Sequence, residues 1–391
     1  MVHPAAMEPE SVQTDTPAAT GTTEPRVWVV LGDKPGDNAQ VRAIEQALPW
    51  ACIHKHIQVH DPFILGKPKV GPTLYHIDRE RSDPLEPPWP DLILTSGRRP
   101  ANVALWIREQ SGGHTRIVLV GKPSTMPDDY DLVIYSAENQ FPPLPNLQAI
   151  SLPLMRVDEA EIATAAVEWE PRLRELPRPL IAFLVGGPTG PFVFNRPTTR
   201  RLLDCIQRVI DETGGTPYIT TSRRTPPGVT AALRTGLPKG GQLYAWSADA
   251  AENPYRGLLG LADGFVVTGD SMSMMVEVIR LRKPLVIFPL AVSSLGALDQ
   301  FRRAFTRWLF KPGSSGLTGR MRQALAGMLY HLHIVTQTRD FVAFHDMLVD
   351  KGLAAYANDT LLGPSCAQVP DDLGLAVQRI MALMATGRPT P

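Results

Sequence analysis

Short, continuous runs of apolar residues recur along the chain and alternate with stretches of helical spacing. The first four runs occupy residues 27–31, 92–95, 117–120 and 132–135. Runs that are apolar throughout are typical of parallel strands covered on both faces. Apolar residues recur every three or four positions at 38–48 and 101–110, between these runs. The alternation predicts a first α/β unit built on a parallel sheet.

A second series of the same kind follows after residue 179. Its predicted strands are 180–185, 217–221, 243–246, 265–268 and 285–288, and its predicted helices are 198–213, 228–235 and 271–281. Two such series predict an α/β fold of two doubly wound, Rossmann-like units that face each other across a cleft. In these sheets ligands bind beyond the carboxyl ends of the strands.

The composition of the remaining segments sets the expected boundaries. Residues 1–24 are rich in Pro, Thr, Ala and Glu without apolar periodicity, so we expect a disordered segment. A helical pattern at 158–170 and a segment with two prolines at 176–179 place the units at 25–175 and 176–365. The tail is mainly helical, with patterns at 320–330, 341–351 and 371–384, and residues 366–391 form a final helix and tail.

Charge and cysteine content narrow the function classes. The 391 residues hold 39 Lys+Arg and 39 Asp+Glu, so no global field favours a nucleic-acid partner. Cys52, Cys205 and Cys366 are far apart and lack metal-ligand spacing, which indicates a reducing compartment. No apolar run is long enough to span a bilayer, and no signal peptide is recognisable. We expect a bacterial-type cytoplasm, and docking at the inner face of the membrane stays open.

The segment Gly264–Leu290 carries the strongest chemical signal. Asp270, Ser271 and Ser273 follow a buried strand and begin a helix, where free N–H groups and the helix dipole favour an anion. Glu277 lies one helical turn beyond Ser273, within reach of a hydroxylated group beside that anion. An anion next to a diol is what a nucleoside diphosphate presents. Alternatively, this is the generic unit of a parallel sheet, and Glu277 is a partly buried structural carboxylate.

Two arginine-containing loops, one in each unit, follow predicted strands. They contribute the candidates Ser96, Gly97, Arg98, Arg99, Ser222, Arg223 and Arg224. The guanidinium fork binds phosphate or carboxylate in bidentate fashion, so two facing loops fit a phosphorylated substrate. The alternative is that these arginines pair with carboxylates between the units.

Three further loops contain residues suited to ligand contact. The candidates are Gly36, Asn38 and Gln40 after the first strand, Gly186, Gly187 and Pro188 after residue 185, Asn253 and Tyr255 in a turn, and Met274 beside the serines. The glycines allow close backbone approach, and Tyr255 could stack on a base. In each loop a plain turn or helix cap is the competing interpretation, with Asp37 or Asn38 as the cap.

Other recognisable chemistry is weak. His54, His56 and His60 have no Cys nearby and no clear carboxylate partner, which favours a surface strand over a zinc site. The chain lacks GxSxG and HExxH motifs, so neither a hydrolase elbow nor a zincin is indicated. We therefore expect no metal and no required cofactor.

The segment 295–311 reads as a basic, aromatic, amphipathic helix. Phe301, Phe305 and Trp308 recur at helical spacing, with arginines between them. This pattern fits docking at an anionic membrane surface. It fits equally a helix that packs its aromatic face on the core and leaves its arginines in solvent.

The order of these loops resembles a known family. The motifs are GDKPGDNAQ at 32–40, SGRR at 96–99, GGP at 186–188, TTSRRTP at 220–226, ENPY at 252–255 and TGDSMSMMVE at 268–277. They are similar to those of the mitochondrial fission proteins of plants, named for an elongated-mitochondria phenotype, with many bacterial members. FHDMLVDKGLA at 344–354 also fits. The first loop departs from the family, with Asp33 and Pro35 replacing more usual Gly and Ala or Gly.

That resemblance implies the two-domain glycosyltransferase architecture termed GT-B. The Gly-Asp-Ser…Glu unit is similar to the nucleotide-sugar site of the enzyme that adds N-acetylglucosamine to the peptidoglycan lipid intermediate. The similarity implies that Glu277 binds ribose, that Ser271 and Ser273 hold the diphosphate, and that Arg223 neutralises the leaving phosphate. The first unit would then bind the acceptor and the second the nucleotide sugar.

We therefore expect a glycosyltransferase that moves a sugar from a nucleotide diphosphate to an acceptor, such as a lipid or cell-envelope precursor. Asp33 and Asp37 are the candidate bases, because a base needs a carboxylate or histidine near the acceptor hydroxyl. The alternatives are a nucleotide-sugar 2-epimerase on the same fold and a non-catalytic, membrane-associated scaffold.

Overall fold

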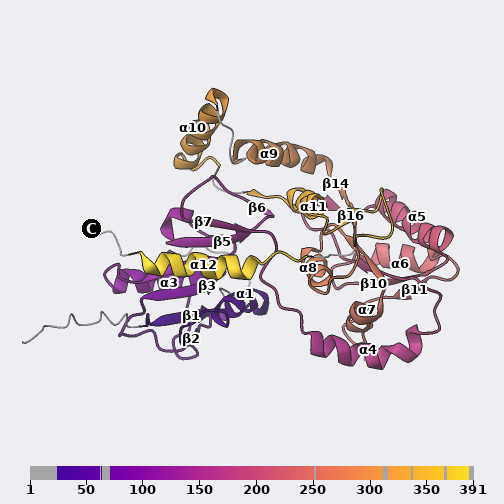
Figure 1. Ribbon diagram of the computed structural model, residues 1–391, viewed down its shortest axis with the longest axis horizontal. Helices are drawn as coiled ribbons and strands as arrows, with labels where there is room; N and C mark the ends of the chain where they lie inside the picture. The colour runs from indigo at the N-terminus through magenta and orange to yellow at the C-terminus, as the bar shows by residue number, and fades with distance from the viewer. Residues whose placement is uncertain are drawn as a thin grey trace, which may run out of the picture.

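The computed structural model describes residues 24–61, 63, 71–250, 252–310, 316–335, 338–364 and 368–386. The segment expected to be disordered lies outside the described residues except for Glu24, as do Cys366 and the end of the tail. The described chain forms two α/β lobes with a helical hairpin beside them (Figure 1).

The first lobe is a parallel sheet in the order β2-β1-β3-β4-β5-β7. The strands are β1 (Val27–Leu31), β2 (Cys52–His56), β3 (Leu92–Ser96), β4 (Arg116–Val120), β5 (Leu132–Ser136) and β7 (Leu147–Ile150). Side chains of α1 (Pro35–Glu45) and α12 (Asp372–Ala385) share one apolar cluster on a face of the sheet, and α3 (Arg98–Gln110) contributes to a second cluster. The interior strands are buried on both faces, which is why their sequences are continuously apolar.

The second lobe is a parallel sheet in the Rossmann order β11-β10-β8-β12-β13-β16. The strands are β8 (Leu180–Val185), β10 (Thr216–Thr221), β11 (Gln242–Tyr244), β12 (Gly264–Thr268), β13 (Leu285–Phe288) and β16 (Ala355–Tyr356). The helices are α5 (Arg196–Thr213), α6 (Pro227–Gly236), α7 (Tyr255–Leu261), α8 (Met272–Arg280) and α11 (Phe341–Asp350). The predicted fold of two doubly wound units is confirmed.

The helix α4 (Glu159–Leu173) belongs with the second lobe by its packing. It lies along α7 (Figure 1), where small residues let the two helices approach. A Cβ on Gly257 would lie 2.6 Å from the ring of Trp169, and one on Gly260 would lie 2.8 Å from Ala166. The boundary predicted at residue 175 assigns this helix to the first unit, so the chain changes lobes earlier than the proline-containing segment indicates.

The C-terminal helix α12 returns across the junction to the first lobe (Figure 1). Just before it packs there, the carboxylate of Asp372 accepts hydrogen bonds from the backbone N–H groups of Ser151 and Leu152, at 2.7 and 2.8 Å. This contact holds the end of the chain against the segment that leaves the first lobe.

Two helices stand beside the lobes and are called the helical hairpin here: α9 (Ser294–Phe310) and α10 (Leu317–His331). The hairpin is followed by β15 (Thr338–Arg339), which pairs antiparallel with β6 (Asn139–Gln140) of the first lobe before α11 enters the second lobe. A second short pair joins β9 (Phe192–Val193) to β14 (Ala291–Val292). The strand β15 thus connects the hairpin to both lobes.

Candidate functional site

A cleft of about 820 Å³ lies between the lobes, where the carboxyl ends of both sheets meet. From the first lobe it is lined by loops after β1, β3, β4 and β5, including Gly36, Asp37, Gln40, Ser96, Gly97 and Arg98. From the second lobe it is lined by Thr189, Arg224, Asp270, Ser271, Ser273 and Met274. These loops include those at the points where strand order reverses, between β1 and β3 and between β8 and β12, which is where such folds bind ligands.

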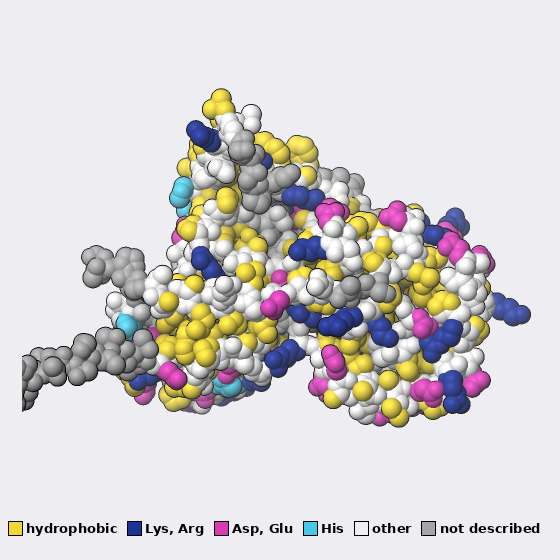
Figure 2. Space-filling view, in the orientation of Figure 1, with side chains coloured by type: hydrophobic (Ala, Val, Ile, Leu, Met, Phe, Trp, Pro, Cys, Tyr) yellow, Lys and Arg dark blue, Asp and Glu magenta, His cyan; other side chains and the backbone are white. Residues whose placement is uncertain are grey.

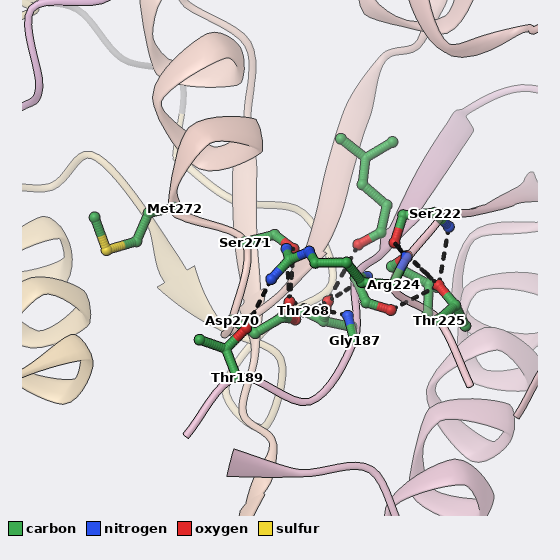
Figure 3. Close-up of polar contacts among 12 residues, drawn as sticks. Gly187, Thr189, Ser222, Arg224, Thr225, Thr268, Asp270, Ser271 and Met272 are labelled. Atoms are coloured by element: carbon green, nitrogen blue, oxygen red, sulfur yellow. Dashed lines mark hydrogen bonds and ion pairs between the residues drawn. The ribbon is translucent and has the colours of Figure 1, made fainter. Parts of the chain in front are cut away.

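The turn after β12 is organised by the buried carboxylate of Asp270 (Figure 3). One oxygen, Oδ2, accepts hydrogen bonds from the Gly187 N–H at 2.9 Å and the Ser271 hydroxyl at 3.0 Å. The other oxygen accepts from the Thr268 hydroxyl at 2.7 Å. A buried carboxylate needs such partners to stay ionised. These hydrogen bonds therefore fix the conformation of the turn from its buried side.

The guanidinium of Arg224 closes the same turn from the cleft side (Figure 3). Its NH2 group lies 3.0 Å from Asp270 Oδ2 and donates to the Ser271 hydroxyl at 3.2 Å, while NH1 donates to the Thr189 hydroxyl at 2.7 Å. This arginine neutralises the charge of Asp270 beside the cleft. Arg223 is exposed and is not among the lining residues, whereas its neighbour Arg224 lines the cleft.

The glycine pair after β8 lies against the protein itself rather than against the cleft. A Cβ on Gly186 would lie 2.1 Å from the Ser271 hydroxyl, and one on Gly187 would lie 2.0 Å from the Arg224 carbonyl oxygen. The Gly186 N–H donates to the Thr268 hydroxyl at 2.8 Å. The close approach expected for these glycines is to the Asp270 turn, and neither they nor Pro188 line the cleft.

The helix α8 presents its first turn to the cleft. Ser271 is its N-cap residue but makes no side-chain capping hydrogen bond, and the next three residues line the cleft. The first N–H groups of a helix have no partner within it. Together with the helix dipole they favour an anion at this point. The predicted anion-binding turn is therefore placed in the cleft, with Arg224 beside it.

The side chain of Glu277 lies against α7, the helix that precedes α8 in the chain. Its Oε2 accepts a hydrogen bond from the Tyr255 hydroxyl at 2.5 Å, and burial raises the pKa of the carboxyl above its usual value. Burial and the neighbouring Glu277 also raise the pKa of Tyr255. Neither residue lines the cleft. Tyr255 thus holds the Glu277 carboxylate in place.

In the first lobe, Asp37 is the candidate base that faces the cleft. Burial is the largest cause that raises the pKa of its carboxyl, and Lys34, 4.0 Å away, opposes that rise. The carboxylate of Asp37 lies over the loop that follows β3, since a Cβ on Gly97 would be 2.8 Å from Asp37 Oδ2. A raised pKa suits a carboxylate that exchanges a proton near neutral pH.

Three other first-lobe candidates have structural partners within the lobe. The side chain of Asn38 donates to the Gly32 carbonyl at 2.8 Å and accepts from the Gly32 N–H at 3.1 Å. Arg99 forms an ion pair with Asp33 at 2.9 Å and also donates to the Phe63 carbonyl. These three side chains are absent from the cleft lining. Arg99 thus pairs with a carboxylate within the first lobe rather than between the units, and of the two candidate bases only Asp37 lines the cleft.

The two remaining candidates of the second lobe also have structural partners. Ser222 lies in a turn with Thr225, whose hydroxyl accepts from the Ser222 N–H at 2.9 Å and bonds to the Gly186 carbonyl at 2.6 Å. Asn253 accepts from the Tyr255 N–H at 3.0 Å and lines a separate hollow between α4 and α7. Both fix loops rather than face the cleft.

Sequence reasoning missed several residues that line the cleft: Lys122, Ser124, Thr189, Glu138, Asn139 and Arg339. Lys122 and Glu138 follow β4 and β5, so the strand-end rule applied to the other loops could have found them. Glu138 is 7% exposed, and its Oε2 has no hydrogen-bond partner among the described residues. The cleft is therefore lined by the carboxylate of Glu138 besides those of Asp37 and Asp270.

The histidines of the second strand are on an exposed edge. β2 is the outermost strand of the first sheet, and His54 there pairs with Glu45 at 2.6 Å. The interpretation of this stretch as a surface strand is confirmed. Within the described ranges, no group of three His, Cys, Asp or Glu side chains could hold a metal ion.

The helix α9 pairs its arginines with carboxylates and leaves Phe301, Phe305 and Trp308 exposed, whereas Phe310 is buried. Arg302 and Arg303 both pair with Asp299, at 2.8 and 2.6 Å, and Arg307 pairs with Asp340 at 2.7 Å. Phe301 is 73% exposed and Trp308 52%. This arrangement differs from the second interpretation of the segment, in which the aromatic face packs on the core; the interpretation as a membrane-docking helix stays a prediction. No described helix is both long and apolar enough to cross a membrane.

The chain is similar to proteins of one family. A plant protein, mitochondrial fission protein ELM1 of Arabidopsis thaliana, is 25% identical over 220 residues, which is 51% of each chain. The match thus spans about half the length of that relative. An uncharacterised protein of Rickettsia prowazekii is 23% identical over 67% of this chain and 82% of its own.

Among solved structures, UDP-GlcNAc 2-epimerase of Neisseria meningitidis bound to UDP-GlcNAc is 9% identical over 91% of this chain and 100% of its own, with a TM-score of 0.44. Residues 35–307 match the family described as mitochondrial fission ELM1. That match covers more than half of the sequence, and the chain belongs to the mitochondrial fission ELM1 family.

Proposed function

We propose that this protein is a GT-B-type glycosyltransferase that binds a nucleotide-diphosphate sugar in the cleft. The observation that carries the proposal is the first turn of α8. It lacks a side-chain cap, it lines the cleft, and Arg224 lies beside it. Backbone N–H groups, a helix dipole and a guanidinium together stabilise a diphosphate, both when bound and when it leaves with the bond electrons.

Further residues near this turn are assigned to the diphosphate and the ribose of the donor. Ser271 and Ser273 contact the diphosphate from the same turn. Glu277, held by Tyr255, accepts hydrogen bonds from ribose hydroxyls once the nucleoside lies along α8. No metal or cofactor is required, since the diphosphate charge is met by protein dipoles and cations.

The proposed base is Asp37, which faces this turn from the other lobe. An acceptor hydroxyl placed between the lobes gives its proton to the carboxylate as its oxygen attacks the anomeric carbon of the sugar. The bond from that carbon to the diphosphate breaks, and the diphosphate leaves with the electron pair. Gly36, Gln40, Ser96, Gly97 and Arg98 surround the acceptor side of the cleft.

A second candidate function is a nucleotide-sugar 2-epimerase on the same fold. The observation in its favour is that two carboxylates, Asp37 and Glu138, line the cleft together. Epimerisation needs groups that remove and return a proton on the sugar itself. It would change the sugar without any acceptor, which sets it apart from transfer.

We also propose that the protein acts in the cytoplasm, at an anionic membrane surface, through α9. The exposed Phe301, Phe305 and Trp308 would enter the lipid interface. Since the arginines between them are ion-paired, the attraction would be mainly apolar. A non-catalytic scaffold would use the same surface without turnover.

The test is a thermal-shift panel of UDP-, GDP-, ADP- and CMP-linked sugars on wild type, Glu277→Ala and the control Glu109→Ala. A ligand at 100 times its dissociation constant stabilises by about 2.7 kcal/mol. We expect a shift with one nucleotide class that persists in the control and disappears in Glu277→Ala. No shift with any sugar nucleotide would contradict the proposal and favour the scaffold. If a shift is seen, chromatography of the sugar after incubation without an acceptor distinguishes an epimerase, which changes the sugar, from a transferase, which does not.

A further inference from the structure

Two cationic side chains that no part of the proposed donor site uses meet in the cleft. Lys122 follows β4 in the first lobe, and Arg339 lies on β15, the short strand after the helical hairpin. Both line the cleft. They come from segments more than two hundred positions apart, so only the fold brings them together. Figure 2 shows Lys and Arg side chains gathered where the two lobes meet.

The guanidinium of Arg339 is fixed beside the donor turn. It lies over the ring of Phe341, 4.6 Å from the ring centroid, and its NH2 group is 4.0 Å from the sulfur of Met272. Met272 begins α8, so Arg339 stands next to the turn proposed to hold the diphosphate. An apolar ring and a thioether hold this cation in position without neutralising it.

Lys122 and Arg339 repel each other and have no counter-ion among the described residues. In the part of the chain that the structure describes, no carboxylate lies within 4.0 Å of either charged group. Burial lowers the pKa of Lys122, and Arg339 and Arg302 lower it further. Arg302 already pairs with Asp299. Both residues are exposed overall, so water screens part of this repulsion, and an anion bound between them would relieve the rest.

The carboxylates that share the cleft do not serve as that anion. Glu138, Asp37 and Asp270 also line it. Asp270 pairs with Arg224 at 3.0 Å and Asp37 lies 4.0 Å from Lys34. Glu138 forms no ion pair with a described residue, and its backbone carbonyl accepts the Asp340 N–H at 2.6 Å.

We propose that Lys122 and Arg339 form a second anion site, which binds a phosphate group carried by the other substrate of the cleft. The assignment of that substrate as the sugar acceptor rests on the proposed function; the anion site itself does not. An arginine fork and a lysine point charge are the usual pair for phosphate. Ser124 and Asn139 line the same wall and can donate further hydrogen bonds.

The position of the site suggests how the phosphate arrives. Arg339 follows the helical hairpin, whose α10 exposes Leu317, Met321 and Met328. Figure 2 shows hydrophobic side chains on the hairpin at the top of that view. A phosphate on a lipid headgroup and one on a soluble phosphoester present the same chemistry to the two cations. The experiment therefore includes an arm for each source.

The first arm measures stabilisation of the full chain by inorganic phosphate and pyrophosphate, with sodium chloride at equal ionic strength as reference. The variants are Lys122→Gln, Arg339→Gln and the exposed control Lys239→Gln. Losing one charge-assisted hydrogen bond, worth about 1.5–3 kcal/mol, should weaken anion binding at least tenfold. We expect this loss in Lys122→Gln and Arg339→Gln, and none in the control.

The unliganded variants give a second readout. Lys122→Gln removes one of two unpaired like charges, so its melting temperature without anion should equal or exceed that of wild type. A purely structural lysine would instead destabilise the fold when replaced. Unchanged phosphate and pyrophosphate stabilisation in both cleft variants would overturn the proposal.

The second arm measures sedimentation with phosphatidylcholine vesicles, with and without phosphatidylglycerol. If both cleft variants lose binding that depends on phosphatidylglycerol, the phosphate comes from a headgroup. If only the soluble anions lose affinity, the source is a soluble phosphoester. The sugar-nucleotide panel tests the donor site separately. A thermal shift that is lost in Glu277→Ala but kept in Lys122→Gln would support the donor site even if the phosphate measurements contradict the anion site.

Discussion

The two lobes present the same kind of loop to the cleft but hold it in different ways. In the second lobe, the turn after β12 is built on Asp270, whose side chain is 0% exposed and joins β8, β10 and β12 loops. In the first lobe, the loop after β1 is joined to the next by Arg99 and Asp33, whose carboxylate is 42% exposed. One loop is set by a network around a fully buried carboxylate, and the other by an ion pair whose carboxylate is exposed although its arginine is only 14% exposed.

The difference indicates which side of the cleft has a fixed loop geometry before a ligand binds. A buried carboxylate with several partners has one stable geometry, because every alternative leaves a charge unsatisfied. A surface ion pair contributes little and can rearrange. The second-lobe wall of the cleft, proposed to hold the donor, is therefore fixed by buried contacts, whereas the first-lobe wall can adapt. This division suits a protein that must fix a diphosphate and accommodate a larger partner.

The largest effect should come from breaking the buried network. Asp270→Ala leaves the Gly187 N–H, the Thr268 hydroxyl and Arg224 without their shared acceptor. Breaking a buried ion pair costs about 3–5 kcal/mol, which urea unfolding will measure.

The matched variant in the other lobe is Asp33→Ala, which removes the partner of Arg99. A surface pair contributes at most about 1 kcal/mol. If the two aspartate variants lose similar stability, the contrast between the lobes is wrong.

A smaller effect is expected from the glycines. Gly187→Ala would place its Cβ 2.0 Å from the Arg224 carbonyl oxygen, so the backbone must shift. Overpacking of this kind costs about 1–3 kcal/mol. Gly36→Ala has no atom within 4 Å of the new Cβ and lies in α1, so its stability should stay equal or rise. Equal losses in thermal unfolding would contradict this.

The smallest effect concerns the charge of Glu277. Because burial raises the pKa of its carboxyl from 4.5, ionisation costs the folded state more than the unfolded state. Its contribution is present below pH 4.5 and is lost as the pH rises through the folded pKa. Glu277→Gln keeps an acceptor for Tyr255 without the charge. Its stability relative to wild type should increase from acidic to neutral pH in urea titrations; a constant difference would refute this.

Much of the fold was predictable because the interior strands are buried on both faces. Such strands must be continuously apolar, so β1, β8 and β13 appear in the sequence with the bounds they have in the structure. The strand β16 was not predictable, because two residues carry no periodicity and pairing with β13 alone defines it. The placement of α4 was missed since an amphipathic pattern does not name the surface that covers it.

The site was predictable where a loop follows a strand end and its residues face outward. Ser273 and Arg98 meet both conditions, and they line the cleft. Asn38 and Gly187 meet the first only, and a sequence does not show that their partners are Gly32 and Asp270. Arg339 was beyond reach, because it enters the cleft on a strand that follows the helical hairpin.

The strand pair β6–β15 has a mechanical consequence. Arg339 lies on the same two-residue strand that ends the hairpin, and Arg303 of α9 donates to its backbone carbonyl. A tilt of the hairpin would therefore shift the backbone of Arg339, whose guanidinium packs on Phe341 and Met272. By thermodynamic reciprocity, an anion that holds the guanidinium also holds the hairpin at one angle. Anion binding in the cleft and the orientation of the helical hairpin would thus be coupled through β15.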